Sequence, residues 1–255
     1  MDRTDTSADS VGTARAQGAD SAGSYEIEGH TVTMPVQVRR ARQAAATFVV
    51  PFGTAQRLVE HTGLRASRRG RFSIASLAVV EYLDNDLGTY DELALAVVVD
   101  DPTVAKPPRG VVSTYIHRLP VSEHFTCVAG RGIWGFPKWE ADLDVTVGTD
   151  AHGALLGPDG TILDVTVRRG PIRLPRRALD MVSFTFDEGV LRRTEWRSEG
   201  DGPTFARPGG CTVTVGYGHP IADEVRSLGL PKRALMSIVD PAMRASFSAP
   251  TVVVT

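Results

Sequence analysis

Short runs of hydrophobic and β-branched residues recur along the chain and predict a protein built mainly from strands. The runs are five to nine residues long and most end at Gly, Pro or Asp, as strands do. Many follow one another without a long helix between them, which favours antiparallel pairing. The predicted strands are 31–38, 44–50, 72–80, 93–99, 110–118, 141–147, 161–167, 181–186 and 211–215.

Helical periodicity is rarer. Thr54 and Ser122 are suited to cap the first two predicted helices, and Gly130 or Gly132 has the conformational freedom to end the second. Pro241 is expected to kink or break the last one. The predicted helices are 54–61, 122–129, 221–228 and 233–247. The pattern as a whole predicts an α+β fold dominated by antiparallel sheet, with a few peripheral helices.

The first 24 residues are mainly Ser, Ala, Gly, Thr and Asp and offer almost nothing to bury, so they predict a disordered tail. The remainder, 25–255, is short enough for one domain. The tail lacks the apolar core of a secretory signal, and no apolar run long enough to cross a membrane follows, so we expect a cytoplasmic protein. A formal net charge of -2 predicts no general attraction to nucleic acid or anionic lipid.

Cysteine and histidine spacing gives no sign of a metal site. Cys127 and Cys211 lie far apart, outside any CxxC pattern, and are expected to be buried thiols. The six histidines form no HxxxH or HExxH pair. We therefore expect no metal.

The segment from Gly130 to Gly135 satisfies the pattern GxGxxG, which in other contexts binds dinucleotides. That fingerprint needs a preceding strand and a helix that opens within it. Here Pro137 and a strand-like run follow instead, so we expect no dinucleotide cofactor. The chain also lacks a GxSxG nucleophile elbow.

Lysine usage is more informative, because only three of the 28 basic residues are lysines. One of them, Lys138, lies in the aromatic segment WGFPKW. If this segment is buried, the aromatic rings disfavour the charged amine and lower the pKa of Lys138, which yields the neutral form that attacks carbonyls. Pro137 would hold the side chain on a stiff turn. The alternative is a lysine whose stem covers an aromatic face while its charge stays in water.

The stretch AGRGIWGFPKWEADLDV resembles the active-site segment of the acetoacetate decarboxylase superfamily, and Lys138 falls on its imine-forming lysine. Glu81 and Glu92 look like the two acidic positions of the family. Arg42 matches the upstream arginine, with Arg40 as an alternative. The run 219–250 is similar to the family's closing region, so the likeness covers roughly residues 30 to 250.

The resemblance implies a cone-like or barrel-like arrangement of antiparallel strands around a buried lysine, usually in a homo-oligomer. In this family the lysine is activated by desolvation or by a neighbouring cation. Acetoacetate decarboxylases proper have a second lysine after the first, whereas Trp139 follows here. Desolvation alone would then have to supply the pKa shift.

The resemblance implies a lyase that decarboxylates a β-keto acid through an imine on Lys138, with no cofactor. Glu92 would act as general acid and base, supported by Glu81, while Arg42 holds Glu92 or the substrate carboxylate. Three aromatic residues, Trp134, Phe136 and Trp139, would line the substrate pocket.

Two alternatives stay open. In the first, the same imine serves an aldolase, dehydratase or cyclase that acts on pyruvate or another 2-keto acid. In the second, the chain is a non-catalytic module that binds small molecules. Release of carbon dioxide separates the first alternative from decarboxylation, and reductive trapping of the imine separates both from the second.

Overall fold

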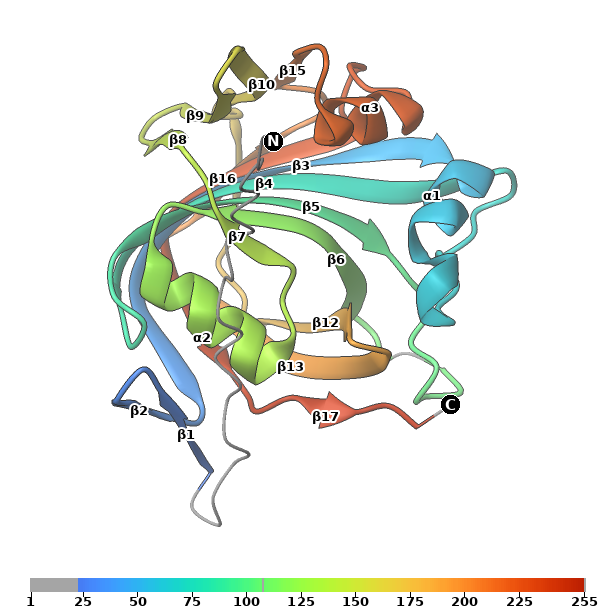
Figure 1. The fold of residues 1–255 in the computed structure, drawn as a ribbon. Coiled ribbons are helices and arrows are strands. Elements are labelled where there is room, and N and C mark those ends of the chain that lie inside the picture. The colour runs from blue at the N-terminus through green and yellow to red at the C-terminus, as the bar shows by residue number, and fades with distance from the viewer. Residues whose placement is uncertain (1–22, 107, 255) are drawn as a thin grey trace, which may run out of the picture.

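The computed structural model describes residues 23–106 and 108–254, and in these residues seven long strands close into a barrel (Figure 1). Neighbouring strands pair antiparallel, except that β6 and β12 are parallel. Because β13 also pairs with β16, the ring has no open edge along this path. Around the ring the strands are β16 (Met236–Phe247), β3 (Val36–Pro51), β4 (Phe72–Asn85), β5 (Tyr90–Val98), β6 (Val112–Val121), β12 (Leu179–Asp187) and β13 (Val190–Gly200). The predicted strand-dominated, barrel-like fold is confirmed.

Shorter elements surround the barrel. A four-stranded sheet consists of β8 (Leu143–Val147), β9 (Ala151–Gly157), β10 (Gly160–Val167) and β15 (Cys211–Val215). The remaining strands are the hairpin β1 (Ser24–Ile27) and β2 (His30–Thr33), then β7 (Lys138–Glu140), β11 (Ile172–Leu174), β14 (Thr204–Arg207) and β17 (Thr251–Val252). The helices are α1 (Phe52–Val59), the 3-10 turn η1 (Glu60–Thr62), α2 (His124–Trp134) and α3 (Pro220–Ser227).

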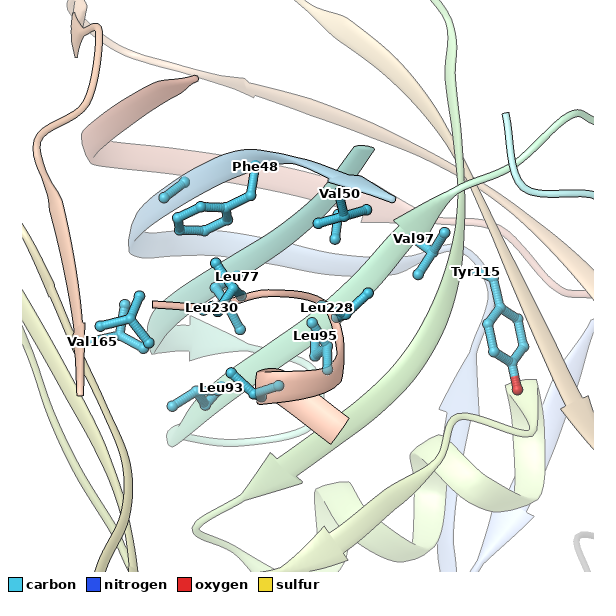
Figure 2. Packing of buried hydrophobic residues seen from close by; sticks show 14 of the residues in the cluster. Phe48, Val50, Leu77, Leu93, Leu95, Val97, Tyr115, Val165, Leu228 and Leu230 are labelled. Carbon is cyan, nitrogen blue, oxygen red and sulfur yellow. The ribbon is translucent and has the colours of Figure 1, made fainter. Parts of the chain in front are cut away.

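Strands β3, β4 and β5 have buried residues on both faces, and each face serves a different core. One face of β3, β4 and β5 carries Phe48, Leu77 and Leu95, which pack against α3 and the four-stranded sheet through Leu228 and Val165 (Figure 2). Truncating a side chain of this size in such a core costs about 2–5 kcal/mol. The other face, which we call the cavity face, contributes to a second core together with α2. Neighbouring residues on one strand therefore enter different environments.

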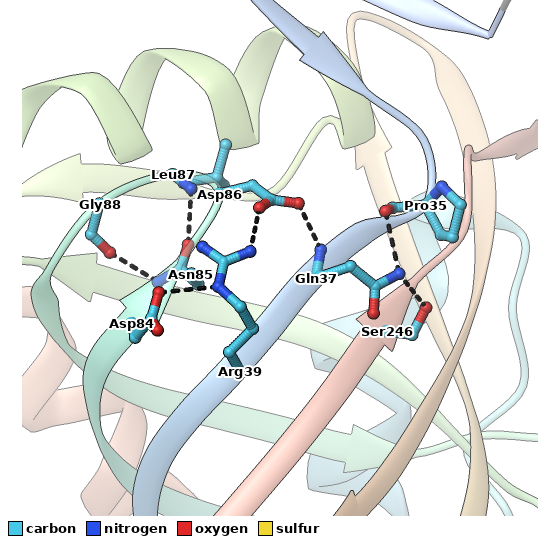
Figure 3. A network of polar contacts seen from close by, with 9 residues as sticks. All are labelled: Pro35, Gln37, Arg39, Asp84, Asn85, Asp86, Leu87, Gly88 and Ser246. Carbon is cyan, nitrogen blue, oxygen red and sulfur yellow. Dashed lines mark hydrogen bonds and ion pairs between the residues drawn. The ribbon is translucent and has the colours of Figure 1, made fainter.

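Polar contacts fix the turn between β4 and β5 against β3 (Figure 3). Arg39 pairs with Asp84 at 2.8 Å and with Asp86 at 2.5 Å. Asp86 also accepts a hydrogen bond from the backbone N–H of Gln37 at 2.7 Å. Solvent-exposed pairs of this kind contribute about 0–1 kcal/mol each, so their main effect is on the position of the turn.

The segment predicted as a helix at 233–247 is the long strand β16, so this prediction was wrong. Strand β16 pairs with β3, β13 and β14, and these ladders outweigh the local helical pattern. Pro241 lies where the register with β3 shifts between Asp240 and Met243, a place where no ladder hydrogen bond from its nitrogen is needed.

The helix ends also differ from the predictions. Pro51, not Thr54, precedes α1, and no side chain caps that helix. Glu123, not Ser122, caps α2, because its carboxylate accepts hydrogen bonds from the backbone N–H groups of Phe125 and Thr126. Gly135, with φ of 64°, ends α2.

Each of the nine predicted strand runs overlaps an observed strand, and 211–215 coincides with β15. The sequence did not reveal the longer strands β9 and β13 or the short strands β1, β7, β11, β14 and β17. Most of the predicted tail lies outside the described residues, although Ser24 already begins β1. Within the described residues, no helix is long and apolar enough to cross a membrane. Cys127 is buried as expected, whereas Cys211 is only half-buried.

Candidate active site

Lys138 is delivered into the barrel by a sharp exit from α2. The left-handed conformation of Gly135 ends the helix, and the chain passes through Phe136 and Pro137 into the short strand β7. Strand β7 pairs parallel with β6, with Lys138 beside Leu119. The backbone on both sides of the lysine is therefore held by hydrogen bonds, which limits the movement of its side chain.

The amine of Lys138 is buried and surrounded by polar partners. The side chain of Lys138 is 4% exposed and that of Glu92 is 9% exposed, and Nζ lies 3.2 Å from Oε2 of Glu92. Nζ also donates to Oγ1 of Thr126 at 3.0 Å and approaches the hydroxyl of Tyr90 at 3.4 Å. Three different elements, α2, β5 and β7, thus fix the position of one nitrogen.

Gly130 explains how the lysine stem fits against α2. A Cβ atom at this glycine would come within 2.6 Å of Cδ and 3.0 Å of Cε of Lys138. The methylene chain therefore lies directly on the helix backbone. The GxGxxG segment thus lies within and at the end of α2, where Gly130 makes room for the lysine and Gly135 ends the helix.

Two tyrosines extend the polar cluster. The rings of Tyr82 and Tyr90 stack with centroids 4.3 Å apart. The hydroxyl of Tyr82 donates to Oε1 of Glu92 at 3.3 Å. Burial is the main cause that raises the pKa of both phenols, so both are protonated near neutral pH.

The cluster faces a cavity of about 130 Å³ on the cavity face of the barrel. An engineered apolar cavity of about 150 Å³ holds a benzene molecule, so this space suits a small organic molecule. The walls are mainly aliphatic and aromatic, and Lys138 is the one cation among the described residues that line them.

The charge of Lys138 differs from the expectation. Burial lowers the pKa of Lys138, but the Tyr90 oxygen and the Glu92 carboxylate raise it, and the net direction is upward. The prediction that aromatic burial lowers the pKa of Lys138 is therefore wrong. The physical reason is the buried carboxylate 3.2 Å away, which stabilises the ammonium.

Comparison with known proteins agrees with this architecture. The sequence matches the family described as acetoacetate decarboxylase (ADC) over residues 28–239. The chain belongs to the acetoacetate decarboxylase family. A comparison with curated protein sequences finds no match.

Solved structures of the family share the fold at low sequence identity. An acetoacetate decarboxylase from Legionella pneumophila subsp. pneumophila str. Philadelphia 1 is 15% identical with a TM-score of 0.63, and the match covers 86% of this chain and 87% of that one. The enduracididine biosynthesis enzyme MppR, complexed with pyruvate, is 14% identical with a TM-score of 0.61, covering 88% and 93%. An acetoacetate decarboxylase-like enzyme from Sphingomonas wittichii RW1 is 13% identical with a TM-score of 0.59, covering 89% and 96%.

Of the acidic and basic residues that the family resemblance suggested, the structure brings only Glu92 to Lys138. Arg42 and Glu81 lie on the opposite face of β3 and β4, 3.8 Å from each other. Glu81 accepts a hydrogen bond from the backbone N–H of Val147 in β8 at 2.8 Å, and the Arg42 side chain is 47% exposed. Neither lines the cavity, so their geometry does not support the roles predicted for them.

The three aromatic residues separate in the same way. Trp134 and Phe136 line the cavity, with ring centroids 5.7 Å apart. Trp139 instead packs against the core formed with α3 and the four-stranded sheet. Adjacent residues of a strand point to opposite faces, so a residue that follows the lysine within β7 is directed away from the amine.

The sequence interpretation missed Tyr82, Tyr90 and Thr126. Strand periodicity could have found the tyrosines, because Tyr90 precedes Glu92 by two residues and Tyr82 pairs with Tyr90. Thr126 had no comparable signal, since its contact with Lys138 depends on how α2 is placed against β7.

Proposed function

We propose that this protein decarboxylates a small β-keto acid through an imine on Lys138. The observation that carries the proposal is the buried Lys138–Glu92 pair, 3.2 Å apart, facing a mainly apolar cavity. Membership of the acetoacetate decarboxylase family supports an enzyme of this superfamily. The geometry explains how such an enzyme would work without an organic cofactor.

Substrate entry must first produce a neutral amine, because the resting site favours the ammonium. Glu92 is the proton acceptor in contact with Nζ. A substrate carboxylate brings a second negative charge into the cavity, and two like charges in a low dielectric favour protonation of one carboxyl group. Transfer of the proton from Lys138 to Glu92 then leaves an amine that is ready to attack.

The amine adds to the substrate ketone to give a carbinolamine, and Glu92 returns its proton to the hydroxyl group, which leaves as water. The resulting iminium accepts the electron pair of the bond between the α-carbon and the carboxylate. That bond breaks and carbon dioxide leaves an enamine. Protonation of the enamine carbon and hydrolysis release the ketone and restore Lys138.

The charge balance of the cavity favours loss of the carboxylate. Apart from Lys138, the described lining residues provide no cation to hold a carboxylate through an aldol reaction. Carbon dioxide release removes the negative charge from an apolar space, where an unpaired charge is costly. A 2-keto acid that keeps its carboxylate leaves the negative charge in the apolar cavity throughout the reaction.

Borohydride reduction tests the imine. The protein is incubated with a panel of 2-keto and 3-keto acids and reduced, and the modified peptide is mapped by mass while carbon dioxide is measured. We expect an adduct on Lys138 and carbon dioxide released in step with loss of the 3-keto acid. An adduct with a 2-keto acid and no carbon dioxide would favour the aldolase, dehydratase or cyclase reaction. If no acid forms an adduct at Lys138, both imine reactions are excluded and the non-catalytic binding module is the remaining alternative.

A further inference from the structure

One polar side chain in the cavity has no hydrogen-bond partner among the described residues. Gln43, on β3, lines the cavity, and its amide makes no hydrogen bond to any of the described residues. The neutral polar side chains Asn85, Ser183, Tyr82 and Tyr90 of the lining each make at least one hydrogen bond: Asn85 within its turn, Ser183 as acceptor from Trp196, Tyr82 as donor to Glu92 and Tyr90 as acceptor from Lys138. An amide on the wall of a ligand-sized cavity with nothing to bond is suited to a ligand.

The position of Gln43 relative to the amine follows from the strand register. Gln43 pairs with Val80, and Val80 pairs with Glu92, so the three residues form one row across β3, β4 and β5. Two strand spacings place the Cα atoms of Gln43 and Glu92 about 10 Å apart. A substrate of a few carbons whose ketone meets Lys138 beside Glu92 would extend from the amine towards Gln43.

Resting on the proposed function, we propose that Gln43 is the residue that recognises the substrate carboxylate, through hydrogen bonds from its Nε2 amide. The hydroxyls of Tyr90 and Ser183 also line the cavity, but each already accepts a hydrogen bond, from Lys138 and from Trp196. The Gln43 amide is the neutral lining group that makes no hydrogen bond to the described residues, so it can turn to meet the carboxylate. The N–H groups of the amide fix the direction of the carboxylate and leave its charge uncompensated.

The neutral amide suits a substrate that must lose its carboxylate. A guanidinium would form two charge-assisted hydrogen bonds and stabilise the carboxylate before the reaction. An interaction that is stronger in the ground state than in the transition state slows the chemical step. A neutral amide orients the carboxylate with less of this penalty, so Gln43 serves as an orienting group for decarboxylation.

Binding of a 3-hydroxy acid tests Gln43 separately from the imine, because such an acid has the carboxylate but no ketone. We would measure the affinity of 3-hydroxybutyrate by calorimetry for wild type, Gln43→Leu and Gln37→Leu. The control changes a glutamine of the same strand whose exposed side chain bonds Ser246 at 3.1 Å (Figure 3). We expect Gln43→Leu to weaken binding about tenfold to a hundredfold, the range for a hydrogen bond to a charged group, and the control to match wild type.

Trapping of a ketone without a carboxylate separates recognition from general damage. Gln43→Leu should form the reduced adduct with acetone at the wild-type rate and lose adduct formation with a 3-keto acid. Gln43→Arg should lower both KM and kcat for the keto acid. The proposal would be overturned if wild type and Gln43→Leu bound 3-hydroxybutyrate with equal affinity. It would also be overturned if Gln43→Leu lost adduct formation with acetone as much as with the 3-keto acid. Weakened 3-hydroxybutyrate binding in a protein that forms no adduct would support the role of Gln43 and refute the imine instead.

Discussion

Two neighbouring rows of residues across β3, β4 and β5 have opposite surroundings. Arg42, Glu81 and Asp91 are paired in register, and so are Gln43, Val80 and Glu92. Each member of the first row is adjacent in the chain to one of the second. Yet Gln43, Val80 and Glu92 line the cavity, while the first row lies towards the four-stranded sheet.

The difference shows how burial and partners decide what a carboxylate can do. Glu92 is buried, with an amine at 3.2 Å and a substrate-sized space beside it. Glu81 has a backbone N–H of β8 and a half-exposed guanidinium at 3.8 Å. We propose that the first arrangement moves protons between two buried groups, whereas the second ties one sheet to another.

The strongest test of this contrast replaces each glutamate by glutamine. Glu92→Gln removes the group that accepts and returns the proton, and general acid–base catalysis contributes about 10²- to 10⁴-fold to rate. We expect kcat for a 3-keto acid to fall by that factor. Glu81→Gln should change kcat less than about threefold. A larger loss for Glu81→Gln than for Glu92→Gln, measured by carbon dioxide release, would reverse the assignment of the two faces.

Gly130→Ala tests how closely the cavity face holds the lysine. The added Cβ would meet the lysine stem at 2.6 Å, so the amine must shift. A misplacement of about 1 Å costs about 10²-fold in rate, which is the loss we expect in kcat. Gly53→Ala in α1 is the matched control, because its Cβ would make only an ordinary contact at 3.8 Å. Comparable kcat in both variants would show that the lysine position is not critical.

Trp139→Lys recreates the two-lysine sequence of acetoacetate decarboxylases proper. Because Trp139 packs away from the cavity, the new ammonium should not reach Lys138 and the pH dependence of kcat should stay unchanged. Loss of a half-buried aromatic should lower the free energy of unfolding by about 2 kcal/mol. A pH–rate profile displaced towards acid, measured against wild type, would show that residue 139 does influence the amine.

Asp91→Asn tests how much the buried negative charge of Asp91, in the row of Arg42 and Glu81, destabilises the fold. The pKa of Asp91 is raised from 3.8 to about 6. Burial is the largest cause, followed by the negative charges of Glu81 and Asp144. A raised folded-state pKa means that stability is full below about pH 4 and declines as the pH rises through about 6. The variant should therefore be about 1 kcal/mol more stable than wild type at pH 8, after allowance for solvent screening, and no more stable at pH 3.5. Denaturant unfolding at both pH values provides the measurement, and a gain at pH 3.5 alone would contradict the sign.

Much of the fold follows from local pattern. Alternating and β-branched runs such as 44–50 and 72–80 are strands because their side chains suit a pleated, buried surface. The interpretation of 233–247 as a helix failed because the periodicity around Pro241 is ambiguous and three partner strands, distant in sequence, decide the outcome.

The sequence by itself determined the family, the strand-rich barrel and the lysine, because a rare residue in a distinctive aromatic segment is a local feature. Only the tertiary structure decided which of Arg42 or Gln43, and which of Glu81 or Glu92, faces the cavity. A shift of one residue reverses the face of a strand, and the register shifts near Arg40 in β3 cannot be seen in a single sequence. The charge state of Lys138 was likewise decided by Glu92 and Tyr90, which come from a different strand.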